Sequence, residues 1–113
     1  MKLPNLEHAD VAEAKITEYL LNEAHPSNQG KAAFFFSFGF TLEAWPVLAD
    51  AMRKHAADYE IAGISTTEHG TKYLIEGALI TPDARNPDVR TVWIVDEGET
   101  IPRLVTAYRL RRK

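Results

Sequence analysis

The sequence predicts an α+β fold, with helices in its first half packed on a four-stranded antiparallel sheet in its second half. Two observations carry this prediction. Apolar residues recur at helical spacing up to about residue 57, and from residue 58 onward they alternate with a period of two. The strand-like segments also follow one another through short turns with no helix between them, which favours an α+β arrangement over an alternating α/β one.

The first helix is expected over Asp10–Asn22. Its apolar stripe consists of Ala12, Ile16, Tyr19 and Leu20. Asp10 is expected to cap the start by accepting hydrogen bonds from the first free backbone N–H groups. The helix should end before Pro26, because the residue that precedes a proline disfavours the helical backbone.

Two further helices are expected before the sheet. Gly30–Phe38 has the helical period, although its run of three phenylalanines also fits a buried strand. The adjacent alanines and the helix that follows favour the helix. The third helix should begin near Thr41 or Glu43 and run to about Ala57. Pro46 then lies in its first turn, where the missing N–H costs little.

Four strands are expected in the second half. They are Tyr59–Thr66, Thr71–Thr81, Val89–Val95 and Ile101–Leu110. A turn around Gly70 joins the first two, and the third is apolar on both faces, which indicates an interior position in the sheet. The helices should therefore cover one face of a four-stranded meander.

Length and composition fit a single domain. The 113 residues are 45% hydrophobic and 26% charged, which suffices for one core but not for two. The domain is expected to span residues 1–113, with a helical part at 1–57, a sheet at 58–110 and a basic tail at 111–113.

Several classes of protein are disfavoured. The chain has no cysteine, which excludes a disulfide framework, a thiolate zinc site and a cysteine nucleophile. Its four histidines are not spaced as metal ligands and it has no Gly-rich phosphate loop, so neither metal nor cofactor is expected. It has no apolar run near the roughly 18 residues of a membrane span and no signal-peptide pattern. We therefore expect a cytoplasmic protein without membrane contact.

The charge is unevenly distributed. The net charge of −3 is atypical of a nucleic-acid-binding protein. Residues 100–113, however, include five basic and no acidic residues. This end of the chain forms either a local positive patch or a solubilising tail.

Two candidate site residues lie in the hinge between the first two predicted helices. His25 can both give and take a proton near neutral pH, so it is the candidate proton-transfer group. The alternative is a surface or capping histidine. Lys31 can hold a phosphate or stabilise negative charge in a transition state, unless it is simply a solvated cation.

The last two strands carry a second group of candidates. Alternation can gather Thr91, Trp93, Thr106 and Tyr108 into one polar and aromatic patch. A tryptophan can stack on a base, and hydroxyl groups can bind phosphate oxygens. The alternative is a set of cross-strand pairs that stabilise the sheet.

Two arginines on the same strands, Arg90 and Arg103, are candidate phosphate ligands. The planar guanidinium fork matches the geometry of a phosphate group. Pairing with surface acids is the alternative for both.

A set of short motifs spans nearly the whole chain. They are Met1-Lys2-Leu3-Pro4-Asn5, Lys15-Ile16, Tyr19-Leu20-Leu21, His25-Pro26, Gly30-Lys31-Ala32, Phe35-Phe36, Gly39-Phe40, Arg90-Thr91-Val92-Trp93-Ile94 and Pro102-Arg103-Leu104-Val105-Thr106-Ala107-Tyr108. Together they resemble an uncharacterised family of small bacterial domains, which occur free-standing and at the ends of larger toxin-like proteins. The motifs are not a known catalytic signature, so the resemblance implies family membership and no particular activity.

The layout also resembles the barnase–EndoU–colicin–RelE superfold of metal-independent ribonucleases. Members place a His, Lys or Arg of the helical part against Arg, Thr, Ser or Tyr of the last strands. The resemblance implies that His25 and Lys31 meet the candidates on the strands, although no member's motif matches residue for residue. Those candidates are Arg90, Thr91, Trp93, Arg103, Thr106 and Tyr108.

Two functions are compatible with these observations. The first is a metal-independent, endoribonuclease-like domain of the toxin type, acting on RNA with His25 as the acid/base. The further catalytic candidates are Lys31, Arg90, Arg103 and Thr106, and the substrate-binding candidates are Thr91, Trp93 and Tyr108. The second is a non-enzymatic interaction module, such as an antitoxin, immunity or regulatory protein, which binds a small cognate protein through Arg103–Lys113.

Overall fold

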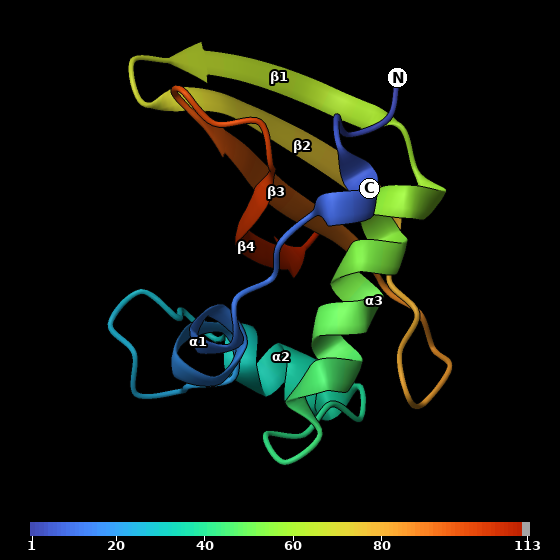
Figure 1. Cartoon of the computed structure of the whole chain (residues 1–113). Coiled ribbons are helices and arrows are strands. Elements are labelled where there is room, and N and C mark those ends of the chain that lie inside the picture. Colours follow the sequence, from blue (N-terminus) through green and yellow to red (C-terminus); the bar gives the residue numbers. More distant parts are fainter. Residues whose placement is uncertain (112–113) are drawn as a thin grey trace.

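A four-stranded antiparallel sheet lies over a layer of helices in the computed structural model, which describes residues 1–111 (Figure 1). The strands are β1 (Ile61–Thr67), β2 (Gly70–Ala78), β3 (Asp88–Asp96) and β4 (Arg103–Arg109). They pair in the order β1-β2-β3-β4, as a meander. The predicted α+β class and the interior position of the third strand are therefore confirmed. Of the predicted basic tail, residues 112–113 lie outside the described residues.

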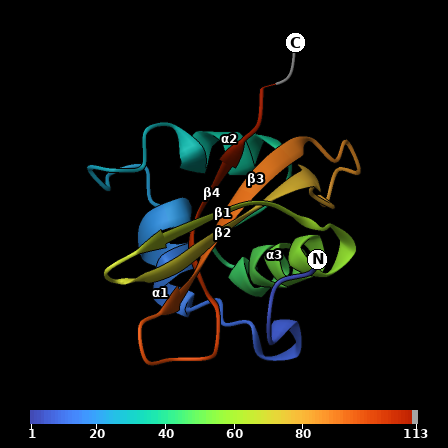
Figure 2. The same ribbon diagram turned by 90° about the horizontal axis from the view of Figure 1, so that it is seen from above.

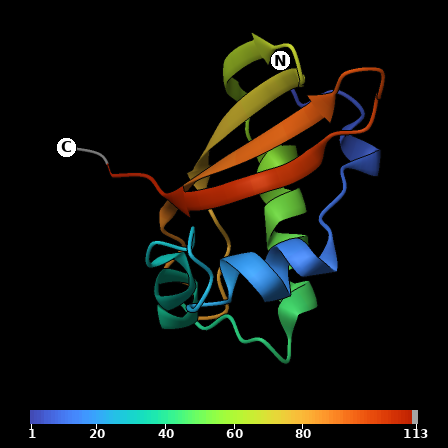
Figure 3. The ribbon, with the colours of Figure 1, turned by 90° about the vertical axis from the view of Figure 1, so that its left-hand side faces the viewer.

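The helical layer is built from short elements. They are η1 (Leu6–His8), α1 (Glu13–Lys15), η2 (Ile16–Leu20), α2 (Lys31–Ser37) and α3 (Trp45–Asp58). The segment predicted as a buried strand or a helix forms the helix α2, with Phe35 fully buried. Pro46 lies in the first turn of α3, as predicted. Figures 2 and 3 show these helices on one side of the sheet, so the other face of the sheet, here called the outer face, has no helix over it.

Asp10 does not cap a helix. Its backbone N–H donates to the carbonyl of Pro102 at 2.8 Å, and its own carbonyl accepts from the Leu104 N–H at 2.9 Å. These bonds tie the segment to the start of β4, in a parallel bridge with Arg103. The helix begins only at Glu13. The predicted cap is wrong because the backbone of Asp10 pairs with the start of β4 instead.

A bulge in β4 decides which of its residues share a face. Val92 pairs with Thr106 and Trp93 pairs with Leu104, so Val105 is the extra residue. The insertion puts Leu104 on the core face beside Trp93 and Thr106 on the opposite side of β4, which is an edge strand, so that Thr106 remains within reach of the helical layer. Strict alternation along β4 would instead have placed both residues on one face.

A chain of buried hydrogen bonds links α3 to the sheet. The Trp93 Nε1–H donates to Thr91 Oγ1 at 3.0 Å, and Thr91 Oγ1 lies 3.1 Å from Nδ1 of His55. The His55 Nε2 lies 3.0 Å from the carbonyl oxygens of both Gly77 and Val89. Because a carbonyl can only accept, the proton of the neutral ring resides on Nε2 and Nδ1 accepts from the hydroxyl. These hydrogen bonds therefore satisfy the neutral ring of His55, and its burial favours this uncharged form.

We expect the stability of the fold to fall as the pH drops below about 6.5. Burial lowers the pKa of His55 from 6.5, although the two carbonyl hydrogen bonds and the charges of Asp58 and Asp88 oppose this shift. The unfolded chain then binds a proton that the folded core excludes. The free energy of unfolding should decrease by up to about 1.4 kcal/mol per pH unit until the folded pKa is passed.

Urea unfolding at pH values between about 7.5 and 5.5 measures this dependence. His55→Gln should flatten it. His69→Gln should leave it in place, because His69 lies in the exposed turn between β1 and β2. A pH dependence that survives in the His55 variant would show that another group is responsible.

Candidate functional site

Tyr19 lies at the centre of the candidate site. It belongs to η2, a π-helical turn, and such turns are rare and frequently mark functional positions. Its phenolic oxygen lies 2.9 Å from Thr106 Oγ1 on β4. The His25 ring meets the Tyr19 ring edge-on at 5.1 Å between centroids, and the Nζ atoms of Lys15 and Lys31 lie 5.1 and 5.8 Å from the Tyr19 centroid. Three sequence candidates, His25, Lys31 and Thr106, thus converge on one ring, in what we call the Tyr19 cluster.

Buried Asn28 holds the Tyr19 cluster together. Its side-chain amide donates to the backbone carbonyls of Tyr19 at 2.5 Å and Leu20 at 3.3 Å, while its side-chain oxygen accepts from the Ala32 N–H at 2.9 Å. One side chain therefore satisfies the last carbonyls of η2 and an early N–H of α2, groups that helix ends leave unpaired. This fixes Tyr19 against the start of α2, where Lys31 lies.

The tautomer of His25 is set by its neighbour. The Ser27 N–H donates to Nδ1 of His25 at 3.0 Å. A ring nitrogen that accepts carries no proton, so the proton of the neutral ring lies on Nε2. Within the described residues Nε2 has no hydrogen-bond partner. It is therefore the nitrogen that can meet a ligand.

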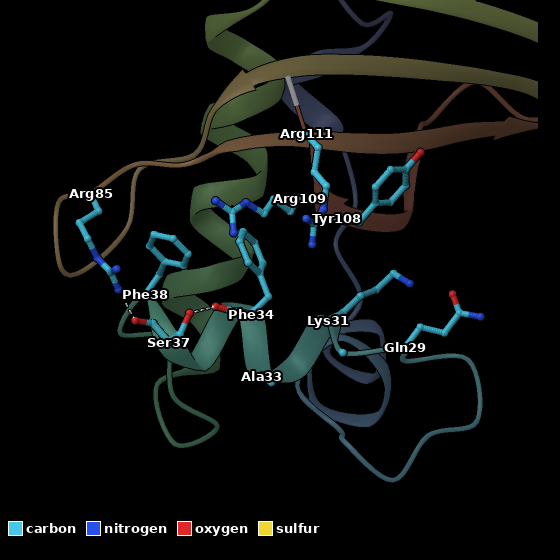
Figure 4. A pocket seen from close by; sticks show the side chains of 11 residues that line it. Gln29, Lys31, Ala33, Phe34, Ser37, Phe38, Arg85, Tyr108, Arg109 and Arg111 are labelled. Atoms are coloured by element: carbon cyan, nitrogen blue, oxygen red, sulfur yellow. Dashed lines mark hydrogen bonds between the residues drawn. The ribbon is translucent and has the colours of Figure 1, made fainter. Parts of the chain in front are cut away.

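A groove of about 800 Å³ runs between α2 and the end of β4 (Figure 4). Lys31 lies at one end of it, and Arg85 of the loop before β3 lies at the other. Arg109 and Arg111 line the side formed by β4 and the residues after it. These four cations are its charged lining residues within the described chain. Lys31 belongs both to the groove and to the Tyr19 cluster, so the two form one continuous site.

Three of the groove cations have no acid partner among residues 1–111. The ion pairs within residues 1–111 include none made by Lys31, Arg109 or Arg111. Lys31 Nζ donates to the Asn28 carbonyl at 3.3 Å, and the guanidinium of Arg109 lies 5.9 Å from the centroid of Phe34. The groove therefore presents local positive charge on a chain of net charge −3, and this charge favours an anionic ligand.

The two predicted phosphate ligands on the strands are paired with acids. Arg90 donates to the phenolic oxygen of Tyr108 at 3.1 Å and to the Glu76 carboxylate at 2.8 Å, and these bonds raise its pKa. Arg103 donates to both oxygens of Asp96, at 2.7 and 3.0 Å. This pairing raises the pKa of Arg103 and lowers that of Asp96. Arg90 reaches the groove only through Tyr108, and Arg103 lies outside its lining.

Thr91 and Trp93 are not accessible to a substrate. Both are fully buried and belong to the hydrogen-bonded chain beneath the sheet. Thr91 pairs with Ala107, so Thr106 and Tyr108 lie on the opposite face of the sheet. The expected patch of these four residues does not form, and the alternative of a sheet-stabilising role fits Thr91 and Trp93.

Sequence reasoning missed two residues that organise the site. Tyr19 is part of an apolar stripe by its spacing, and Asn28 follows a hinge proline like an ordinary loop residue. One available signal is chemical, because a buried tyrosine hydroxyl usually requires a hydrogen-bond partner. The partner, Thr106, lies 87 residues further along the chain.

The family model described as "Domain of unknown function (DUF6883)" matches residues 2–111. The chain belongs to the DUF6883 family. No curated protein matches this DUF6883 chain.

The fold of this DUF6883 domain is similar to that of a solved structure. It is described as "Contact-dependent growth inhibition toxin - immunity protein complex from Klebsiella pneumoniae 342". The TM-score is 0.70 at 17% sequence identity, and the alignment covers 88% of this chain and 98% of that chain. At this identity the likeness is one of fold.

Two further observations concern ligands and membranes. Within residues 1–111 of the DUF6883 chain, no three His, Asp or Glu side chains are grouped so that they could hold a metal ion. Within the same residues, no helix combines the length and apolarity that crossing a membrane requires.

Proposed function

We propose that this DUF6883 domain is a metal-independent ribonuclease of the toxin type, with its reaction centre at the Tyr19 cluster. One observation carries the proposal. His25, Lys31 and Thr106 come from three separate segments and all contact Tyr19, at the edge of a groove with unneutralised cations. RNA carries its own nucleophile, the 2′-hydroxyl. The protein then has to supply positioning, charge stabilisation and proton transfer.

In the proposed reaction the 2′-oxygen attacks the adjacent phosphorus and loses its proton to solvent. The bond from phosphorus to the 5′-oxygen of the next nucleotide breaks, and the protonated, imidazolium form of His25 delivers its Nε2 proton to that leaving oxygen. In this form Nδ1 also carries a proton, so it has to release the Ser27 N–H. The products are a 2′,3′-cyclic phosphate and a 5′-hydroxyl. Lys31 and Arg109 neutralise the charge that develops on the non-bridging oxygens, and the hydroxyls of Tyr19 and Thr106 orient the reacting groups.

The roles of the strand residues change in this proposal. Tyr108 lines the groove and can contact the substrate, and its phenolic oxygen is held by Arg90. Arg90 is thus a positioning residue, because its guanidinium already binds Glu76. Arg109 takes the place of Arg103 as the strand cation beside the phosphate.

The solved structure with the same fold favours a toxin setting, because it is described as a complex of a growth-inhibition toxin with an immunity protein. The same description supports a second candidate function, in which this chain is a non-enzymatic interaction module that binds a cognate protein. The acid pairing of Arg90 and Arg103 also favours this second candidate, since it removes two cations from an RNA site. The groove cations would then bind an acidic segment of the protein partner.

Incubation of the pure chain with total RNA in the presence of EDTA separates the two functions. We expect fragments with 2′,3′-cyclic phosphate ends, and none from 2′-O-methylated RNA, because that RNA lacks the nucleophile. Tyr19→Phe should slow cleavage by about tenfold or more, since an orienting hydroxyl is lost. Tyr73→Phe, which removes a hydroxyl on β2, is the matched control and should cleave at the wild-type rate. A wild-type chain that cleaves no RNA would instead support the interaction module.

A further inference from the structure

The guanidinium of Arg85 is held as a flat platform at the end of the groove opposite Lys31 (Figure 4). Its Nε donates to the Asp83 carboxylate at 2.6 Å, and its Nη2 donates to the Ser37 carbonyl at 2.5 Å. One face of the group lies over the Phe38 ring, 4.3 Å from the centroid. The side chain nevertheless remains 60% exposed. Two hydrogen bonds thus fix the plane of the group and Phe38 lies against one face, which leaves the other face to a ligand.

The loop around Arg85 keeps this platform in place. Burial alone would raise the pKa of Asp83, but hydrogen bonds from Arg85 and from the Thr81 hydroxyl lower it, so the carboxylate remains charged. Asn86 accepts from the Thr81 N–H at 3.0 Å and closes the loop. Ala84 and Asn86 have φ angles of 64° and 47°, a conformation that costs free energy in residues other than glycine and often accompanies function.

The other groove cations are organised differently. Among the described residues, Arg109, Arg111 and Lys31 have no acid partner. Arg109 also lies over the ring of Phe34. The N–H donors of these three cations can therefore bind phosphate oxygens, whereas Nε and Nη2 of Arg85 already donate to Asp83 and Ser37. The groove combines a stacking surface at one end with phosphate-binding donors along its length. This combination is typical of sites for single-stranded nucleic acids.

We propose that the groove binds an unpaired segment of RNA, with one base stacked on the Arg85 platform and phosphates held by Arg109, Arg111 and Lys31. This inference rests on the proposed ribonuclease function and names its substrate class. An unpaired strand is required because a base inside a duplex cannot offer its face to a side chain. A groove of about 800 Å³ has room for a few nucleotides and not for a double helix.

Binding of a 2′-O-methylated RNA hexamer, measured by fluorescence anisotropy, tests the inference apart from cleavage. The single strand should bind at least about tenfold more tightly than the same strand in a duplex. Arg85→Lys keeps the charge but loses the planar face, so it should weaken binding of the single strand by about tenfold. Arg109→Gln should reduce the slope of log affinity against log salt by about one, since one phosphate contact is lost. Lys72→Gln removes an exposed cation on β2 and should change neither quantity.

Hexamers with one abasic position provide a second measurement, on the wild-type protein itself. One position should lose about tenfold in affinity, and the loss should disappear in Arg85→Lys. Equal binding of every abasic hexamer, or unchanged binding by Arg85→Lys, would overturn the platform even if the chain cleaves RNA. Base-dependent binding without any cleavage would contradict the proposed reaction and leave the groove assignment standing. No detectable binding of the hexamer would overturn the assignment.

Discussion

His25→Ala should lower the rate of RNA cleavage by about 10²–10⁴-fold, the usual contribution of a proton-transfer group. Such a group acts in the transition state, so its loss appears in turnover more than in folding. The His25 ring is only partly buried, and its side chain takes one hydrogen bond, from Ser27. We expect the variant to lose about 0.5–1 kcal/mol of stability. Single-turnover cleavage and thermal unfolding of the same preparation measure both effects.

His8→Ala is the matched control for this experiment. His8 is an exposed histidine in η1, beside Glu7, and it should affect neither cleavage nor unfolding. Wild-type cleavage by His25→Ala would show that another group transfers the proton. A loss of about 2 kcal/mol or more in the free energy of unfolding, well above the expected value, would instead assign His25 a structural role, in line with the capping alternative.

The layout of the fold was predictable because it depends on local periodicity. A change in apolar spacing from 3.6 to 2 marks the boundary between α3 and β1, and apolar residues on both faces of β3 require cover from neighbouring strands. The short helix α2 was ambiguous by sequence, because three consecutive phenylalanines satisfy either period. Its helical form leaves Phe35 buried and places Phe34 beside Arg109, which makes one wall of the groove.

The failures come from contacts between distant segments. The N-terminal residues attach to both edges of the sheet, through the Met1 carbonyl to the Ile61 N–H at 2.8 Å and through Asp10 to Pro102. The local sequence does not indicate that the backbone of Asp10 pairs with a strand and that its side chain does not cap a helix. The β-bulge at Val105 likewise has no recognisable signal in the sequence, yet it decides which β4 side chains face the core.

In the candidate site, too, some features follow from the local sequence and others depend on contacts between distant segments. The hinge pair of His25 and Lys31 could be selected from chemistry alone, since His25 is the hinge residue that can exchange a proton near neutral pH and Lys31 is the hinge cation. The pairing of the two arginines with acids depends on neighbouring strands. Arg90 of β3 pairs with Glu76 of β2, and Arg103 of β4 pairs with Asp96 of β3. Sequence chemistry therefore proposes which residues can bind a phosphate, and the register of the sheet decides which of them are free to do so.

Trp93→Ala should be among the most destabilising single substitutions in the chain, with a loss of about 3–5 kcal/mol. Trp93 is fully buried on the core face of β3, where it pairs with Tyr73 of β2 and Leu104 of β4. Truncation leaves a cavity and also removes the donor to Thr91. Urea unfolding gives the free energy, and a loss near the upper value would leave little of a marginally stable fold at 25 °C.

Trp93→Phe separates the two contributions. It keeps most of the ring volume but removes the Nε1–H, and the Thr91 hydroxyl can still donate to His55. We therefore expect a smaller loss, of about 1–2 kcal/mol. Trp45→Ala is the matched control, because Trp45 is only partly buried at the start of α3, and it should cost less than Trp93→Ala. Had Trp93 been a stacking surface for RNA, its removal would weaken RNA binding and leave unfolding unchanged. A loss of stability below about 1 kcal/mol in Trp93→Ala would contradict the core assignment made here.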